Sequence, residues 1–193
     1  MKEAVKYGII LLIICAAASG LLAAMNLLTK GKIEAQAMAE QSRALKEVLP
    51  EAVDFEPMTR EGKVDYYKGL DAAGVMRGIA FMAEGKGYSS VIVTAVGMAL
   101  DGKITAIKIL SQNETPGLGS RVQEVKSDVT LFDAIAGKKE TAAAPWFQEQ
   151  FAGKNAAELA GVDAISGATV SSRAVMESIK EKAENILKSL VDS

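Results

Sequence analysis

Residues 166–169 form a segment with the residue types of a phosphate-binding site. They read Ser166-Gly167-Ala168-Thr169 and stand directly before a long helical pattern. Small side chains let a ligand approach the backbone, and a helix start offers unpaired N–H groups and the positive end of the helix dipole. Arg173, one turn further on, can add positive charge. From these features alone, simple capping of the helix by Thr169, Ser171 and Ser172 is the favoured interpretation.

A second segment, Glu114-Thr115-Pro116-Gly117-Leu118-Gly119, combines one fixed and two permissive backbone positions. The proline ring fixes one backbone angle, and the two glycines allow angles that other residues avoid. Such a rigid loop can present backbone N–H groups and the Leu118 side chain to a flat ligand. The alternative is an ordinary turn after a strand, because a Gly-x-Gly pair is weak evidence by itself.

The composition excludes several kinds of chemistry. The chain has no histidine, which removes Ser-His-Asp and Cys-His catalysis and histidine-ligated zinc or haem iron. Its single cysteine, Cys15, can form no disulfide within the chain and cannot hold an iron–sulfur cluster alone. A net charge of −2, from 22 basic and 24 acidic residues, argues against nucleic-acid binding. We expect no metal site and no catalytic side chain, so any electron transfer needs a bound cofactor.

Residues 8–28 are long and apolar enough to span a membrane. The run contains no charged residue, and about 20 residues cross the hydrocarbon core. A cleaved signal peptide is the alternative, but signal cores are usually only about 7–15 residues long. We therefore predict a retained single-pass anchor. Lysines on both sides leave its orientation open, and the absence of charge argues against an ion path through this helix.

The part after the anchor should begin with a helix and continue as a sheet. Residues 32–49 predict a helix that Pro50 ends, and residues 66–110 are β-rich. Asp101-Gly102 predicts a hairpin between strands at 91–96 and 104–109. Turns between the other strands are predicted at Gly74, Gly85 and Gly87.

Helices are predicted in the last third of the chain. Short ones are expected at residues 120–126, 146–151 and 155–160. The final helix carries five apolar residues at helical spacing on one face. These are Val175, Ile179, Ala183, Ile186 and Leu190. The expected fold class is therefore α+β, an antiparallel sheet packed with helices and preceded by a single N-terminal transmembrane helix.

Together, the two segments resemble the FMN-binding domain that two membrane complexes share, in the G subunit of the Rnf complex and the C subunit of the sodium-translocating NADH:quinone oxidoreductase. The matching residues are Glu114-Thr115-Pro116-Gly117-Leu118-Gly119, Asp163 and Ser166-Gly167-Ala168-Thr169. The order of parts is also similar: anchor, β-rich stretch, first segment, aromatic pair Trp146-Phe147, second segment, final helix. The short stretch before the flavin segments favours the Rnf protein. Asn113 stands where some members have histidine, which bears on a proton-donating role there and not on the flavin.

The resemblance implies one FMN, joined through its phosphate to the hydroxyl of Thr169 by a flavin transferase. It also implies a set of residues around the flavin. These are Ser166, Gly167, Ala168, Val170, Ser171, Glu114, Thr115, Gly117, Leu118 and Gly119. The expected domains are the stub and anchor at residues 1–31, a juxtamembrane helix at 32–50 and the FMN-binding domain at 51–193.

By the same resemblance, the chain relays electrons within an ion-pumping ferredoxin:NAD oxidoreductase (Rnf) complex. Its expected partners are the other membrane subunits, the flavin transferase and membrane lipid, and it should hold no complete substrate site. We expect it in the cell membrane, with the soluble domain on the extracytoplasmic side. Three alternatives stay open: the quinone-reductase subunit, a tethered domain that holds a phosphate-bearing ligand non-covalently, and an assembly scaffold without cofactor. The coupling ion, sodium or proton, does not follow from the sequence.

Overall fold

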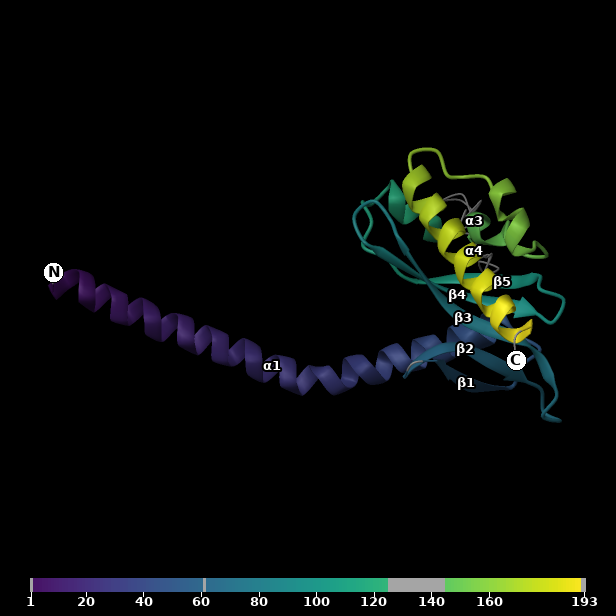
Figure 1. Ribbon diagram of the computed structural model, residues 1–193. Helices are drawn as coiled ribbons and strands as arrows, with labels where there is room; N and C mark the ends of the chain where they lie inside the picture. The colour runs from purple at the N-terminus through teal and green to yellow at the C-terminus, as the bar shows by residue number, and fades with distance from the viewer. Residues whose placement is uncertain (1, 61, 125–144, 192–193) are drawn as a thin grey trace, which may run out of the picture. The chain divides into compact units, whose positions relative to one another are not determined.

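The structure, a computed structural model, describes residues 2–60, 62–124 and 145–191. The chain divides into two compact units, residues 1–40 and residues 41–193. The first is the greater part of one long helix, and the second is a sheet with helices on both faces (Figure 1).

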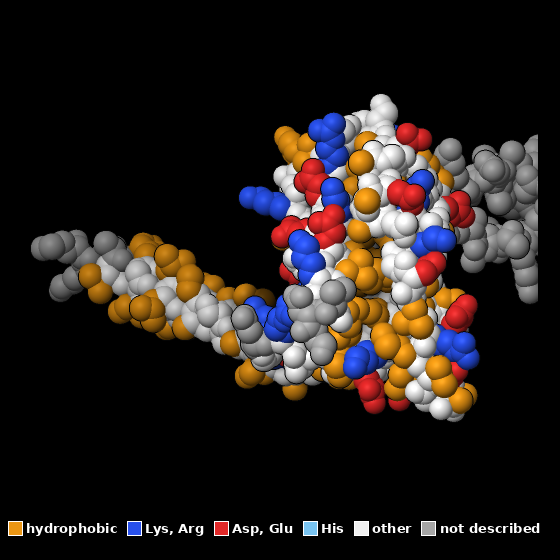
Figure 2. Space-filling view, turned by 45° about the vertical axis from the view of Figure 1, so that its right-hand side comes forward, with side chains coloured by type: hydrophobic (Ala, Val, Ile, Leu, Met, Phe, Trp, Pro, Cys, Tyr) orange, Lys and Arg blue, Asp and Glu red, His pale blue; other side chains and the backbone are white. Residues whose placement is uncertain are grey.

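Helix α1 (Lys2–Val48) joins the predicted anchor and the predicted helix at 32–49 without a break. Its N-terminal part is apolar, with a mean hydropathy of 2.5 in its most apolar window, and none of that window is buried within the protein. Figure 2 shows hydrophobic side chains over the visible surface of this part, whereas the visible surface of the folded unit carries basic and acidic side chains among hydrophobic and other residues. By length and composition, α1 can cross a membrane, as predicted.

Five antiparallel strands follow in chain order as a simple meander. They are β1 (Asp54–Arg60), β2 (Lys63–Leu70), β3 (Met76–Lys86), β4 (Val91–Ala99) and β5 (Ile104–Ser111). The predicted hairpin at Asp101-Gly102 is confirmed, because Gly102 has a φ of +83° and its N–H donates to the Ala99 carbonyl at 3.0 Å. The predicted start of the β-rich stretch at residue 66 is wrong, since the sheet already begins at Asp54.

The remaining elements are short helices and one long one. They are η1 (Gly119–Gln123), α3 (Trp146–Glu149), η2 (Ala156–Gly161) and α4 (Thr169–Val191). The predicted helical pieces are confirmed with shifted ends, and residues 125–126 of the first piece lie outside the described residues. The expected α+β class is confirmed.

One face of the sheet packs against α4 and the short helices, as Figure 1 shows. Four of the five predicted apolar residues of α4 are buried there: Val175, Ile179, Ala183 and Ile186. Leu190 is 38% exposed, so its predicted place in the core is wrong. The opposite face is covered by the last turns of α1, where Ala44, Leu45 and Val48 pack on Ala80 and Ala95.

Glycine allows α4 to lie close to the sheet. The prediction of a turn at Gly85 is wrong, because Gly85 lies within β3. A Cβ atom there would lie only 2.3 Å from the carbonyl oxygen of Ala174 on α4. Gly74 and Gly87 do lie in turns as predicted, with the Gly87 N–H donating to the Ser90 carbonyl at 2.8 Å. The close contact at Gly85 brings the first turns of α4 against the end of β3.

Candidate functional site

The segment before α4 forms a tight turn that ends at the start of the helix. The N–H of Ala168 donates to the Ile165 carbonyl at 2.9 Å, and Gly167 between them has a φ of +81°. A positive φ at the third position is what a type II turn requires, and glycine adopts it without strain. The turn therefore explains why small residues precede Thr169.

Helix α4 begins at Thr169, and its first intrahelical bond runs from the Ser172 N–H to the Ala168 carbonyl at 2.9 Å. The N–H groups of Thr169, Val170 and Ser171 therefore have no acceptor within the helix. Together with the positive end of the helix dipole, they form a suitable place for a phosphate group.

The three hydroxyl groups at this helix start have different surroundings. Ser172 is buried, and its Oγ accepts a hydrogen bond from the Ile165 N–H at 3.1 Å, which braces the turn. Ser171 is also buried and donates to the Glu114 carboxylate at 2.7 Å. Thr169 is exposed, and among the described residues its hydroxyl makes no hydrogen bond. The bond of Ser172 braces the turn and is not a helix cap, because its donor, the Ile165 N–H, lies before the helix. The Thr169 hydroxyl is accessible for chemistry.

The second predicted segment also contains a type II turn. The Leu118 N–H donates to the Thr115 carbonyl at 3.1 Å, with Pro116 second and Gly117, at a φ of +75°, third. The Gly117 N–H donates to Ser120 Oγ at 3.0 Å. This turn leads into η1 and leaves the Leu118 side chain 50% exposed.

Glu114, just before this turn, is the most heavily hydrogen-bonded side chain of the site and is only 6% exposed. One oxygen, Oε1, accepts from the N–H of Ser89 at 3.0 Å and from the N–H and Oγ of Ser90 at 2.9 and 3.1 Å. The other, Oε2, accepts from the Tyr88 N–H at 3.2 Å and from Ser171 Oγ at 2.7 Å. Burial by itself would raise the pKa of Glu114, but the bonds from Ser171, Ser89 and Ser90 outweigh it and lower the pKa below its ordinary value. The carboxylate is therefore charged at neutral pH.

A cavity of about 380 Å³ lies between the two segments. Nine of the eleven predicted site residues line it: Glu114, Thr115, Leu118, Gly119, Gly167, Ala168, Thr169, Val170 and Ser171. Ser166 and Gly117 lie in the adjoining turns and not in the lining. The cavity thus brings together segments that are about 50 positions apart in the sequence.

Tyr88 also lines this cavity and was missed in the sequence. It is 78% exposed and belongs to the loop that joins β3 to β4. Its only sequence signal is an aromatic residue in a turn rich in glycine and serine. Arg121, from η1, is a second residue that was missed, and its Nη1 donates to the Ser166 carbonyl at 3.2 Å, which ties the two segments together. Arg173 lines a different cavity beside Leu159 and not this one.

The lining suits a flat ligand with a phosphate tail. Exposed aliphatic groups of Leu118 and Val170 and the ring of Tyr88 supply apolar surface. The unpaired N–H groups and the Thr169 hydroxyl lie in the same lining. A cavity with apolar walls and a few convergent polar groups is typical of a cofactor site.

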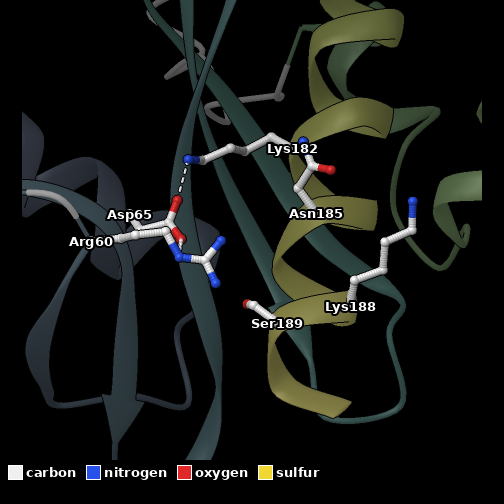
Figure 3. A pocket seen from close by; sticks show the side chains of 6 residues that line it. All are labelled: Arg60, Asp65, Lys182, Asn185, Lys188 and Ser189. Atoms are coloured by element: carbon white, nitrogen blue, oxygen red, sulfur yellow. Dashed lines mark hydrogen bonds and ion pairs between the residues drawn. The ribbon is translucent and has the colours of Figure 1, made fainter. Parts of the chain in front are cut away.

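Another cavity, of about 330 Å³, has a different character (Figure 3). It is lined by Arg60, Asp65, Lys182, Asn185, Lys188 and Ser189. Figure 3 shows the Lys182 side chain reaching from α4 to the Asp65 carboxylate, with which it forms an ion pair. Asp65 is also 4.0 Å from Arg60 Nε. This cavity contains no predicted site residue, and its ion pair fastens α4 to β2.

Two family models match the sequence. The one for the FMN-binding domain matches residues 87–184, and the one for the N-terminal region of RnfG matches residues 1–48. The G subunit of the ion-translocating oxidoreductase complex of Methanosarcina acetivorans is 30% identical over 199 residues, which cover 96% of this chain and 95% of the relative. The G subunit of the Na⁺-translocating ferredoxin:NAD⁺ oxidoreductase complex of Acetobacterium woodii is 30% identical over 193 residues, or 92% and 89% of the two chains. The crystal structure of Shewanella oneidensis NqrC is similar with a TM-score of 0.46 and 20% identity over 74% of each chain.

Proposed function

The chain belongs to the FMN-binding domain family that includes the G subunits of ion-translocating oxidoreductase complexes, and on that premise we propose that it carries one FMN esterified to Thr169 and relays electrons within such a complex. Family membership makes it a membrane-anchored electron-transfer flavoprotein that works beside the other subunits of an Rnf complex. Beyond family membership, we propose that the FMN is bound covalently, that a flavin transferase attaches it, that the chain relays electrons, and that its soluble domain is extracytoplasmic.

The observation that carries the proposal is the position of the Thr169 hydroxyl. It is exposed at the first residue of α4, beside N–H groups without intrahelical acceptors, in a cavity lined by both motif segments. A phosphodiester there keeps a negative charge, which the helix N-terminus stabilises by about 0.3–1 kcal/mol. FMN, when bound, supplies the one- and two-electron chemistry that the side chains of this protein lack.

Attachment is a phosphoryl transfer, and it requires a transferase and a flavin donor with a leaving group on its phosphate. Thr169 Oγ1 forms the new P–O bond and gives up its proton, and the leaving group departs with the electrons of the bond that breaks. The chain itself contributes an accessible hydroxyl and a positive electrostatic environment. Among the described residues the Thr169 hydroxyl makes no hydrogen bond to a side chain, so we propose that the transferase removes the proton.

The chain's own residues then position the flavin and do not act on a separate substrate. Leu118, Val170 and Tyr88 supply apolar surface, and the Ser166–Gly167 turn fixes where the phosphate tail begins. A covalent tether also prevents loss of the flavin to bulk water, which matters on the extracytoplasmic side, where we place the soluble domain. Electrons would then pass between this flavin and centres on partner subunits.

The decisive experiment is the intact mass of the denatured protein, purified from cells that contain the flavin transferase. We expect the mass of one FMN phosphodiester on the wild type, in-gel fluorescence under ultraviolet light, and loss of both in Thr169→Ala. A denatured wild type that has lost its flavin would instead favour non-covalent binding of a phosphate-bearing ligand. A colourless wild type would favour a scaffold, and either result would end the covalent proposal.

The comparisons favour the Rnf protein over the quinone-reductase subunit. The N-terminal match at residues 1–48 is to the RnfG region, and the two relatives described above are both G subunits. The apolar run of α1 has no charged residue, which makes this helix a poor candidate for the path of the coupling ion.

A further inference from the structure

The Glu114 carboxylate joins two segments that both line the proposed flavin cavity. Its donors Tyr88, Ser89 and Ser90 belong to the loop between β3 and β4. Its remaining donor, Ser171, is the third residue of α4 and lies two positions after Thr169. The carboxylate therefore links the loop that carries Tyr88 to the helix start that carries the attachment site.

The same carboxylate has no free capacity for a ligand. A carboxylate offers about four lone-pair positions, and the hydrogen bonds from these four residues number five. Ser90 Oγ is itself held, because it accepts from the Asn113 N–H at 2.8 Å while it donates to Oε1. An additional bond from the flavin to Glu114 would have to displace one of these donors.

Two glycines confine the carboxylate from both sides. A Cβ atom at Gly87 would lie 2.6 Å from Oε1, and one at Gly119 would lie 2.5 Å from Oε2 and 2.6 Å from Ser171 Oγ. Backbone thus approaches each oxygen as closely as glycine allows. The side chain cannot change its position without moving the β3–β4 loop or the turn that leads into η1.

We propose that Glu114 is a positioning residue, which sets the distance between the Tyr88 loop and the start of α4 and so places the Thr169 hydroxyl for flavin attachment without binding the flavin itself. This inference rests on the proposed function, since it concerns the same cavity. It differs from the role implied by the resemblance, in which Glu114 is one of the residues around the flavin.

The substitution Glu114→Gln tests the hydrogen bonds of the carboxylate without changing the size of the side chain. Glu114→Gln keeps the size of the side chain but replaces one accepting oxygen with an NH₂ group, which can only donate. With the NH₂ group in place of Oε2, the Tyr88 N–H loses its acceptor and the Ser171 hydroxyl must turn to accept instead of donate. With the NH₂ group in place of Oε1, the N–H groups of Ser89 and Ser90 lose their acceptor. Because Ser171 is two residues from Thr169, the loss loosens the attachment site as well as the fold.

The experiment uses the full-length protein, produced in cells with the flavin transferase, as wild type, Glu114→Gln, Ser171→Ala and Ser178→Ala. Ser178 is the matched control, because it is a half-buried serine of the same helix, whose Oγ donates to the Val175 carbonyl at 3.0 Å away from the cavity. Three quantities are measured: the initial rate of flavin attachment, the visible circular dichroism of the attached flavin, and the melting temperature from Trp146 fluorescence.

We expect attachment to Glu114→Gln to slow by roughly tenfold, the effect of one lost hydrogen bond to a charged group. The flavin that does attach should show weakened visible circular dichroism, because its surroundings are less fixed. Ser171→Ala should change both quantities in the same direction by a smaller factor, and Ser178→Ala should change neither. Ser171→Ala removes a single hydrogen bond, so it keeps the test valid even where Glu114→Gln folds poorly.

The inference is overturned by wild-type attachment rates and wild-type circular dichroism in Glu114→Gln and Ser171→Ala, whatever their melting temperatures. That result would leave the covalent flavin intact and make Glu114 a residue of the fold alone. A wild-type protein that carries no flavin at all would overturn this inference together with the proposed function. A wild type that holds flavin only non-covalently ends the covalent proposal, and the positioning role is then decided by the circular dichroism of the variants.

Discussion

Replacing Gly85 with alanine should push α4 away from the sheet and so displace the helix whose first residue is the proposed attachment site, Thr169. The added Cβ would lie 2.3 Å from the Ala174 carbonyl oxygen and 2.8 Å from the Ala174 carbonyl carbon, whereas ordinary contact begins near 3.4 Å. The helix must therefore retreat by about 1.1 Å, the difference between 3.4 and 2.3 Å. A backbone carbonyl cannot avoid the clash by changing rotamer.

The energetic cost of this shift comes from the packing that α4 loses against the sheet. Val175 and Ile179 are fully buried beside this contact and would lose packing on the sheet. Overpacking of a close-packed core costs typically about 1–3 kcal/mol, and a backbone clash favours the upper end of that range. For a domain of this size, about 3 kcal/mol lowers the melting temperature by roughly 6–12 °C. Ala174 is five residues after Thr169, so flavin attachment should slow as well.

The assay is thermal unfolding of the full-length protein in detergent, followed by the fluorescence of Trp146. This single tryptophan packs against the same core and therefore reports on it. Gly161→Ala is the matched control, because a Cβ at Gly161 meets nothing within 4 Å and needs no unusual backbone angle. It should alter stability by no more than about 0.5 kcal/mol. Equal melting temperatures for Gly85→Ala and Gly161→Ala would refute the tight contact between β3 and α4.

Two further predictions concern acid pH and the side of the membrane. The folded-state pKa of Glu114 lies below its ordinary value of 4.5, so its contribution to the free energy of unfolding is fully present above pH 4.5 and is lost as pH falls through the lowered pKa. The stability difference between wild type and Glu114→Gln, measured by denaturant unfolding, should therefore shrink below pH 4.5, and a constant difference would contradict this assignment. For the orientation, protease added outside intact cells should remove the soluble domain and leave α1 in the membrane. A soluble domain that stays uncleaved in cells with an intact membrane would instead lie on the cytoplasmic side.

The fold was predictable where local chemistry agrees with the final packing. Asp101-Gly102 correctly marks a hairpin turn, although the loop is formed by Leu100, Asp101 and Gly102, since the Ala99 N–H donates to the Lys103 carbonyl. The apolar spacing of α4 matches its buried face at Val175 and Ile179. Strand β1 gave no such signal, because it is an edge strand with Pro57 at its centre and an irregularity between Met58 and Thr59. Most of its side chains are exposed, so no alternation of buried and exposed residues marks it.

Gly85 shows why a residue type can mislead. Glycine in a β-rich stretch predicts a turn, since turns need its backbone freedom. Here glycine is needed within β3 because it has no side chain, and the carbonyl of Ala174 occupies the space that a Cβ atom would take. That reason depends on a helix about 90 positions later in the chain, so no local pattern could reveal it.

At the site, the two type II turns could be inferred from residue types, because Pro116-Gly117 and Ser166-Gly167 supply the angles that such turns require. Tyr88 and Arg121 could not be inferred in this way. Each reaches the site through long-range packing, Tyr88 through the loop held by Glu114 and Arg121 through its bond to Ser166.

The fold sorts the predicted site residues into two groups by exposure, and the groups should respond differently to substitution. Glu114, Gly119 and Ser171 are buried and bonded or packed to one another, whereas Thr169, Leu118 and Val170 are exposed in the same lining. A buried side chain whose hydrogen bonds are made within the protein supports the residues around it, so its loss lowers stability and flavin attachment together. An exposed residue contributes little to folding and acts on the ligand by contact, so its loss alters the flavin at an unchanged melting temperature. The two segments therefore combine residues that hold the cavity together with residues that contact the ligand. A substitution of the first kind lowers both the melting temperature and the attachment rate, whereas one of the second kind alters the flavin at an unchanged melting temperature.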